Sequence, residues 1–129
     1  MTEVVKDEAA SQMVEDAKKA YTALSKGSKL RKHYIALTVM NNVFRVFVTM
    51  YNLEPEYIAS QKAFLKVLLD SEARRNRFIF KPEFEIIAQA LIHYESIIIS
   101  ATDEQIKEML LLVEGLQDDC KYVVTRRKN

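Results

Sequence analysis

Three side chains in the sequence are of the types that catalysis and metal binding use: His33, His93 and Cys120. Histidine can act as a general base and a cysteine thiolate as a nucleophile, but each needs a partner at suitable spacing. Neither histidine has such a partner, and Cys120 follows two aspartates that disfavour its thiolate. The sequence also lacks a glycine-rich phosphate loop and a metal-binding helix motif. We therefore predict no catalytic residue, no metal and no cofactor, and we expect a protein that is not an enzyme.

Three basic residues, Lys29, Arg31 and Lys32, open a stretch that has no acidic residue before Glu54. Acids at helix starts and bases at helix ends are explained by the helix dipole, but bases at a helix start oppose it. A negatively charged partner would explain this cluster. Pairing with Asp118 or Asp119 near the other end of the chain would explain it equally well.

A second basic cluster consists of Arg74, Arg75 and Arg77, followed by Phe78 and Phe80. Arginines that neutralise phosphates and aromatic rings that stack on unpaired bases form clamps for single-stranded nucleic acid. The apolar stretch Phe78-Ile79-Phe80 is, however, expected to close one end of the hydrophobic core, so the phenylalanines could equally face the core instead of stacking on bases. Because the chain has a net charge of only +1, nucleic-acid binding is the secondary reading.

These side chains must be positioned by helices, because the 129 residues include only two glycines and two prolines. The length fits a single domain covering residues 1–129. We predict an all-α bundle of about five helices joined by short loops, with flexible ends at 1–6 and 125–129. The helices are expected at about 6–26, 29–51, 55–75, from 82 to at least 98, and from 102 onward.

Local signals mark the helix boundaries. Gly27 favours the left-handed conformation that ends a helix, and Ser28 can cap the helix that follows. Pro55 and Pro82 suit the first turn of a helix. Thr102 and Gln105 have the spacing of a capping box.

The stretch Lys29–Tyr51 is expected to lie at the centre of the bundle, because it is apolar on two faces after His33. Asn41, Asn42 and Arg45 interrupt this stretch and exclude a membrane span. The N-terminus does not have the order of an export signal, and the single cysteine suits a reducing compartment. We therefore expect a cytoplasmic protein.

The fourth predicted helix carries extra isoleucines, Ile86, Ile92 and Ile99, outside its main apolar stripe. They could belong to the core, to a partner groove or to a homodimer contact. We favour the core, because additional apolar residues in a small helical domain usually find an inside position.

Short loops make successive helices antiparallel neighbours, so the charges should separate toward two ends of the bundle. One end is predicted to hold the basic residues Lys26, Lys29, Arg31, Lys32, Arg74, Arg75, Arg77 and Lys81, with Lys121 and Arg126 to Lys128 if the last helix ends there. The other end is predicted to hold the acidic residues Asp7, Glu8, Glu54, Glu56, Asp103 and Glu104.

From MTEVVKDEAASQMVEDAKKAYTALSKG through SEARRNRFIFKPEF to RRKN, the whole chain resembles the small early RNA polymerase-binding proteins of T-even bacteriophages in size and helical character. The resemblance implies a non-enzymatic accessory protein that attaches to the host's bacterial RNA polymerase and helps to redirect transcription. It carries over no set of functional residues. From the charge pattern we predict that the partner-binding residues are Lys29, Arg31, Lys32, Arg74, Arg75 and Arg77. The polymerase subunit, the sign of the effect on transcription and any self-association stay open.

Overall fold

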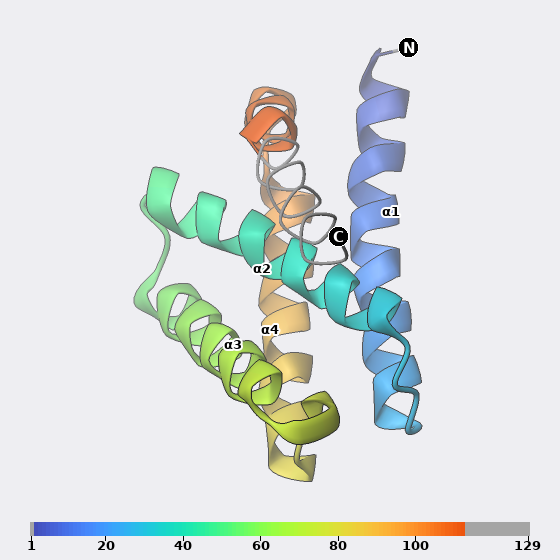
Figure 1. Cartoon of the computed structure of the whole chain (residues 1–129). Coiled ribbons are helices and arrows are strands. Elements are labelled where there is room, and N and C mark those ends of the chain that lie inside the picture. The colour runs from blue at the N-terminus through green and yellow to red at the C-terminus, as the bar shows by residue number, and fades with distance from the viewer. Residues whose placement is uncertain (1, 113–129) are drawn as a thin grey trace, which may run out of the picture.

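The protein is an all-α bundle, as predicted (Figure 1). The computed structural model describes residues 2–112, with side-chain burial from residue 11 onward, and within them it has no strand. A further helical segment covers residues 103–112. The other elements are α1 (Thr2–Ser25), α2 (Arg31–Met50), α3 (Pro55–Ala73), the short 3₁₀ helix η1 (Arg75–Arg77) and α4 (Lys81–Ser100).

The first helix begins earlier than predicted. It begins at Thr2 rather than at about residue 6. The predicted flexible end at 125–129 lies outside the described residues.

Gly27 ends α1 as predicted, with a φ of 99° in the left-handed region. The Gly27 N–H donates to the Leu24 carbonyl and the Ser28 N–H donates to the Ala23 carbonyl, each at 3.0 Å. This pair of bonds is the Schellman motif, which satisfies the last carbonyls of a helix. Ser28 does not cap α2, however: its hydroxyl accepts from the Leu30 N–H at 3.3 Å, and α2 begins only after Leu30.

The capping box before residues 103–112 is present. The Gln105 N–H donates to the Thr102 hydroxyl at 3.1 Å, and the Thr102 N–H donates to the Gln105 side-chain oxygen at 2.9 Å. Two donors that the helix leaves without partners are thereby satisfied.

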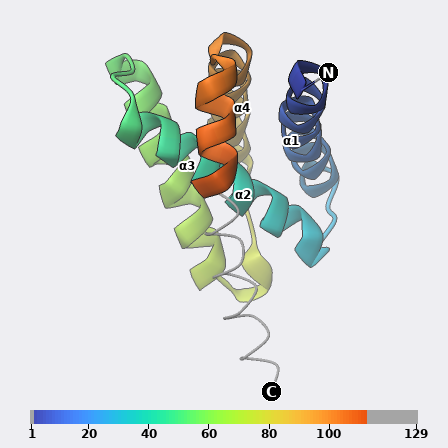
Figure 2. The ribbon, with the colours of Figure 1, turned by 90° about the horizontal axis from the view of Figure 1, so that it is seen from above.

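The helix arrangement places α2 at the centre. Helices α1 and α4 run side by side in opposite directions, and α2 crosses them obliquely while also packing against α3 (Figures 1 and 2). Successive helices are neighbours, as expected from the short loops, but the oblique course of α2 makes the bundle less regular than a simple up-and-down arrangement.

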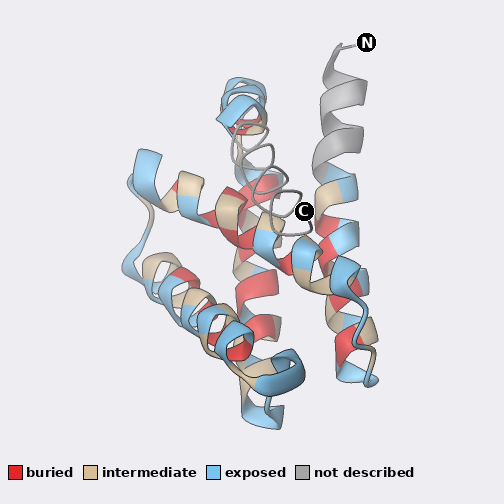
Figure 3. Cartoon of the chain, viewed as in Figure 1, coloured by how far each residue is buried: buried red, intermediate tan, exposed pale blue. Residues whose placement is uncertain are grey.

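The core lies where α2 faces the other helices (Figure 3). From α2 it takes Leu37, Met40, Val43, Phe44 and Phe47, all of which are buried. The second apolar face of α2 is less complete than predicted, because Ile35 and Met50 near the two ends of the helix are exposed. The other buried apolar residues are Val14, Ala17, Ala20, Leu24, Phe64, Val67, Ile79, Ile87, Ala90, Leu91, Tyr94, Ile97, Ile98, Ile106 and Met109.

The preference for a core position of the extra isoleucines on α4 is wrong for two of them. Ile92 is 61% exposed and Ile99 is 77% exposed, whereas Ile86 is partly buried against the core. One face of α4 must remain free in a bundle in which α1, α2 and α3 cover the others, and these two residues lie on it.

Candidate partner-binding site

The segment between α3 and α4 is a tight turn in which two residues have left-handed backbone and side-chain contacts hold it in place. Asn76 and Arg77 have φ values of 60° and 52°, which are uncommon for residues other than glycine. The Arg77 carbonyl oxygen accepts hydrogen bonds from the Ser71 hydroxyl at 2.8 Å and from the Tyr34 hydroxyl at 3.1 Å. Tyr34 belongs to α2 and Ser71 to α3, so this carbonyl joins the turn to both helices.

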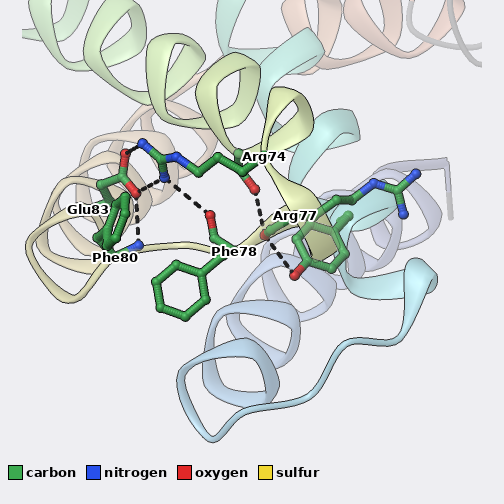
Figure 4. A network of polar contacts seen from close by, with 7 residues as sticks. Arg74, Arg77, Phe78, Phe80 and Glu83 are labelled. Carbon is green, nitrogen blue, oxygen red and sulfur yellow. Dashed lines mark hydrogen bonds and ion pairs between the residues drawn. The ribbon is translucent and has the colours of Figure 1, made fainter.

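An ion pair across the turn fixes the start of α4. The Arg74 guanidinium donates to the Glu83 carboxylate, with 3.0 Å between Nη2 and Oε2, and also to the Phe78 carbonyl at 3.1 Å. The same carboxylate accepts from the Phe80 N–H at 2.8 Å (Figure 4). The hydrogen bond from Arg74, together with the one from the Phe80 N–H, holds the pKa of Glu83 below its usual value. Arg74 therefore holds the turn in place. Because its charge is paired with Glu83, it contributes little to the attraction of a partner.

Two aromatic rings project from this turn. Phe78 is 46% exposed and Phe80 is 50% exposed, and their ring centres lie 5.0 Å apart in an edge-to-face arrangement. The prediction that Phe78, Ile79 and Phe80 close one end of the core is wrong for the two phenylalanines, because only Ile79 between them is buried. Two half-exposed aromatic rings in contact on a turn form an apolar patch of the kind that a partner can cover.

Cations lie against the aromatic rings of this end. The Lys29 Nζ is 5.1 Å from the centre of the Phe78 ring, and the Arg74 guanidinium carbon is 4.3 Å from the centre of the Phe80 ring. The Arg77 guanidinium carbon lies 5.7 Å from the centre of the Tyr34 ring. We call this surface the basic aromatic end, and it comprises Lys29, Arg31, Lys32, Tyr34, Arg74, Arg75, Arg77, Phe78 and Phe80.

A pocket of about 190 Å³ opens beside these rings. It lies between the end of α1, the start of α2 and the turn before α4, and it is lined by Leu24, Ser25, Gly27, Lys29, Tyr34, Phe78, Ile79 and Phe84. Its lining combines apolar side chains with Ser25 and Lys29. The pocket is suited to an apolar side chain carried by a negatively charged segment.

The six predicted partner-binding residues do not all have the same surroundings. Lys29, Arg74 and Arg77 are brought together around Phe78 and Tyr34. Arg31, Lys32 and Arg75 are exposed and make no side-chain hydrogen bond or ion pair with the described residues. Their predicted pairing with Asp118 or Asp119, like the contribution of Lys121 and Arg126 to Lys128, lies outside the part of the chain that the structure describes.

Sequence reasoning missed three residues of the basic aromatic end or its support: Tyr34, Ser71 and Glu83. Glu83 had a local signal, because a glutamate three residues after the residue preceding a helix often bonds back to that residue's N–H. Tyr34 and Ser71 had no such local signal, because the position of the carbonyl that both bind, that of Arg77, depends on how the turn folds.

The residues considered for catalysis lie elsewhere. The His93 ring packs edge-on against Tyr57, with 4.9 Å between ring centres, and its buried Nδ1 has no hydrogen-bond partner among residues 2–112. His33 lies in the first turn of α2, partly buried. Cys120 lies outside the described residues. In the described part of the chain no group of three or more His, Cys, Asp or Glu side chains could hold a metal ion.

Comparisons with known proteins found no matching family model, no matching curated protein and no matching solved structure. Within residues 2–112, no helix combines the length and the hydropathy that crossing a membrane requires.

Proposed function

We propose that this chain is a non-enzymatic protein that binds a bacterial RNA polymerase through its basic aromatic end and thereby modulates transcription in the host cytoplasm. The proposal joins two independent supports. The whole-chain resemblance to the small polymerase-binding proteins of T-even bacteriophages supplies the partner, and the geometry supplies a surface suited to a large acidic protein.

The exposed pair of phenylalanines, flanked by cations on a strained turn, is the observation that carries the proposal. Sparsely populated backbone conformations cost about 1–3 kcal/mol each and persist where the surroundings hold them, often at binding sites. Here the strain presents Phe78 and Phe80 to solvent while Ile79 anchors the turn in the core.

The chemistry of this end matches that of protein interfaces. Central aromatic and arginine residues supply most of the affinity in such interfaces, and surrounding charges speed the encounter. Phe78, Phe80 and the neighbouring pocket would supply the apolar anchors, while Lys29, Arg31, Lys32, Arg75 and Arg77 would face the acidic surface.

A second candidate is binding to single-stranded nucleic acid, favoured by the exposure of Phe78 and Phe80 beside arginines. Three features make it the weaker candidate. The two rings meet edge to face rather than in a parallel stack, Lys29 and Arg74 already cover ring faces, and Glu83 neutralises Arg74.

Affinity capture from a bacterial lysate, with and without nuclease treatment, tests the proposal. Retention of the β and β′ subunits of the polymerase after nuclease treatment supports it. Loss of all partners after nuclease treatment supports the nucleic-acid function instead, and a salt titration with a nonspecific oligonucleotide should then show a steep fall in affinity.

The site is tested by charge reversal. Arg31→Glu with Lys32→Glu should weaken polymerase capture at least tenfold, because both side chains are exposed on the surface that faces the acidic partner. The matched control is Lys62→Glu with Lys66→Glu, which makes the same change of charge at exposed positions of α3. Circular dichroism should show both variants folded. Equal capture by the two variants would move the contact away from the basic aromatic end.

A further inference from the structure

An apolar groove of about 160 Å³ lies at the opposite end of the bundle from the basic aromatic end. Its walls come from Phe47 and Tyr51 at the end of α2, Leu53 and Tyr57 at the start of α3, and Ile97 and Ala101 at the end of α4. The basic aromatic end lies at the starts of α2 and α4. Because each of these helices has 20 residues, the two sites are separated by about one helix length, roughly 30 Å.

The charged residues near this groove in the chain are mostly acidic. Four glutamates, Glu54, Glu56, Glu95 and Glu104, are each next in sequence to a residue that lines it, and one exposed lysine, Lys107, lies two positions after the lining residue Gln105. Glu95 is paired with Lys18, whereas Glu54, Glu56 and Glu104 are exposed. A further exposed glutamate, Glu108, accepts a hydrogen bond from the hydroxyl of Tyr51 at 3.2 Å. We call this surface the acidic groove.

Helix dipoles explain only part of this pattern. Glu54, Glu56 and Glu104 lie at helix starts, where negative charge is favourable. The dipole does not account for Glu108, which lies further along its helix. Met50 and Ile99, each next in sequence to a lining residue, add exposed apolar side chains. An acidic rim around an apolar floor suits a positively charged surface with a projecting apolar side chain.

The basic aromatic end of the same chain has this chemistry. Phe78 and Phe80 are about half exposed, Lys29 and Arg77 lie beside them, and the exposed bases Arg31, Lys32 and Arg75 surround them. Because the two complementary surfaces lie at opposite ends of one molecule, each copy can offer one surface to a neighbour and accept the other.

We propose that a second copy of this chain docks its basic aromatic end into the acidic groove, so that the protein associates head to tail. Such a contact joins two different surfaces, so it produces chains of copies, or a ring where the rotation between copies closes, rather than a symmetric dimer. This inference goes beyond the proposed function. Self-association would also affect the proposed function, because it covers the surface that the polymerase would bind.

Analytical ultracentrifugation of the full-length chain tests the association directly. The average mass should rise with protein concentration at low salt and return toward that of one chain at high salt, because screening weakens contacts between exposed charges. A chain that stays monomeric at every concentration at low salt overturns the proposal.

Two variants with neutral substitutions test which surfaces meet. Lys29→Gln with Phe80→Ser removes the basic aromatic contact, and Glu56→Gln with Glu104→Gln removes charge from the acidic groove. Each variant alone should be monomeric. An equimolar mixture should form a complex that stops at two copies, since it holds one intact surface of each kind. The control, Glu15→Gln with Asp16→Asn, changes exposed acids of α1 outside both surfaces and should associate like the unmodified chain.

The outcomes separate this proposal from the proposed function. The Glu56→Gln and Glu104→Gln variant keeps the basic aromatic end and should capture polymerase at least as well as the unmodified chain. Association by either variant alone would assign the contact to another surface, and no complex in the mixture would exclude head-to-tail docking. Failure of polymerase capture by a groove variant that no longer self-associates counts against the proposed function only.

Discussion

At the scale of single residues, the carbonyl of Arg77 and the carboxylate of Glu83 determine the shape of the basic aromatic end. The first accepts from Tyr34 and Ser71, and the second accepts from Arg74 and the Phe80 N–H. These contacts compensate for the left-handed backbone at Asn76 and Arg77. A binding surface on a turn can be rigid when its backbone groups have such partners.

The lowered pKa of Glu83 leads to a pH prediction. A carboxylate whose pKa is depressed by folding stabilises the protein above its ordinary pKa, which is 4.5 here, and this contribution is lost as the pH falls through the folded-state value. Glu83→Gln should therefore lower the free energy of unfolding at pH 7. The difference from the unmodified chain should shrink below pH 4.5.

Urea unfolding of both proteins between neutral and acidic pH measures this difference. Glu85→Gln, which removes an exposed carboxylate two positions away, is the matched control. A Glu83→Gln variant whose destabilisation is the same at acidic and neutral pH would show that the ion pair with Arg74 does not contribute to stability in this way.

At the scale of elements, the contact between α2 and α3 contains a buried polar pair. The Gln61 side-chain nitrogen donates to the Asn41 side-chain oxygen at 3.0 Å, and both residues are 5% exposed. A buried amide is costly without a partner, so this pair favours the one alignment of the two helices in which the amides meet. Asn41 thus has a structural role in the otherwise apolar face of α2.

A double-mutant cycle tests this pair. Asn41→Leu should destabilise the protein by about 1–3 kcal/mol, because Gln61 loses its partner in the core. Adding Gln61→Met should recover much of that loss, since two apolar side chains can then pack together. Urea unfolding gives the coupling energy. Strictly additive effects of the two substitutions would mean that the amides do not depend on each other.

At the scale of the whole molecule, α2 is the helix that the others share. It contacts α1, α3 and α4, and Leu37, Val43 and Phe44 on it are completely buried. The solvent-facing side of α2 lies close by in sequence: Ile35, two positions before Leu37, is 50% exposed.

Neighbouring substitutions on α2 should therefore differ widely in effect. Leu37→Ala should cost about 2–5 kcal/mol, because it leaves a cavity where the helices meet. Ile35→Ala should change stability by about 0.5 kcal/mol or less, since it removes mostly solvent-exposed area. Thermal unfolding monitored by circular dichroism measures both. Similar losses for the two variants would contradict the central position of the Leu37 face.

The separation of charge is also a property of the whole molecule. The chain has a net charge of only +1, yet its basic aromatic end and acidic groove lie at opposite ends of α2 and α4. Polymerase binding and head-to-tail association would both follow from this distribution, and they would compete for one of its two surfaces.

The sequence by itself marked most of the helix boundaries, because those signals act over a few residues. It missed the start of α1 at Thr2 and placed the start of α2 before Leu30. Gly27, Pro55, Pro82 and the pair Thr102 and Gln105 each mark a boundary that the structure has or misses by a residue. Apolar periodicity also identified most of the buried face of α2, since burial of one helix face depends on spacing along the chain.

Only the tertiary structure decided which surfaces these helices build. The exposure of Phe78 and Phe80, the use of Arg74 by Glu83 and the exposed Ile92 and Ile99 all depend on how α2 crosses its neighbours and how the turn before α4 folds. Periodicity shows that a face is apolar, but not whether another helix reaches it. That depends on contacts between residues far apart in the chain, which the packing of the whole core selects.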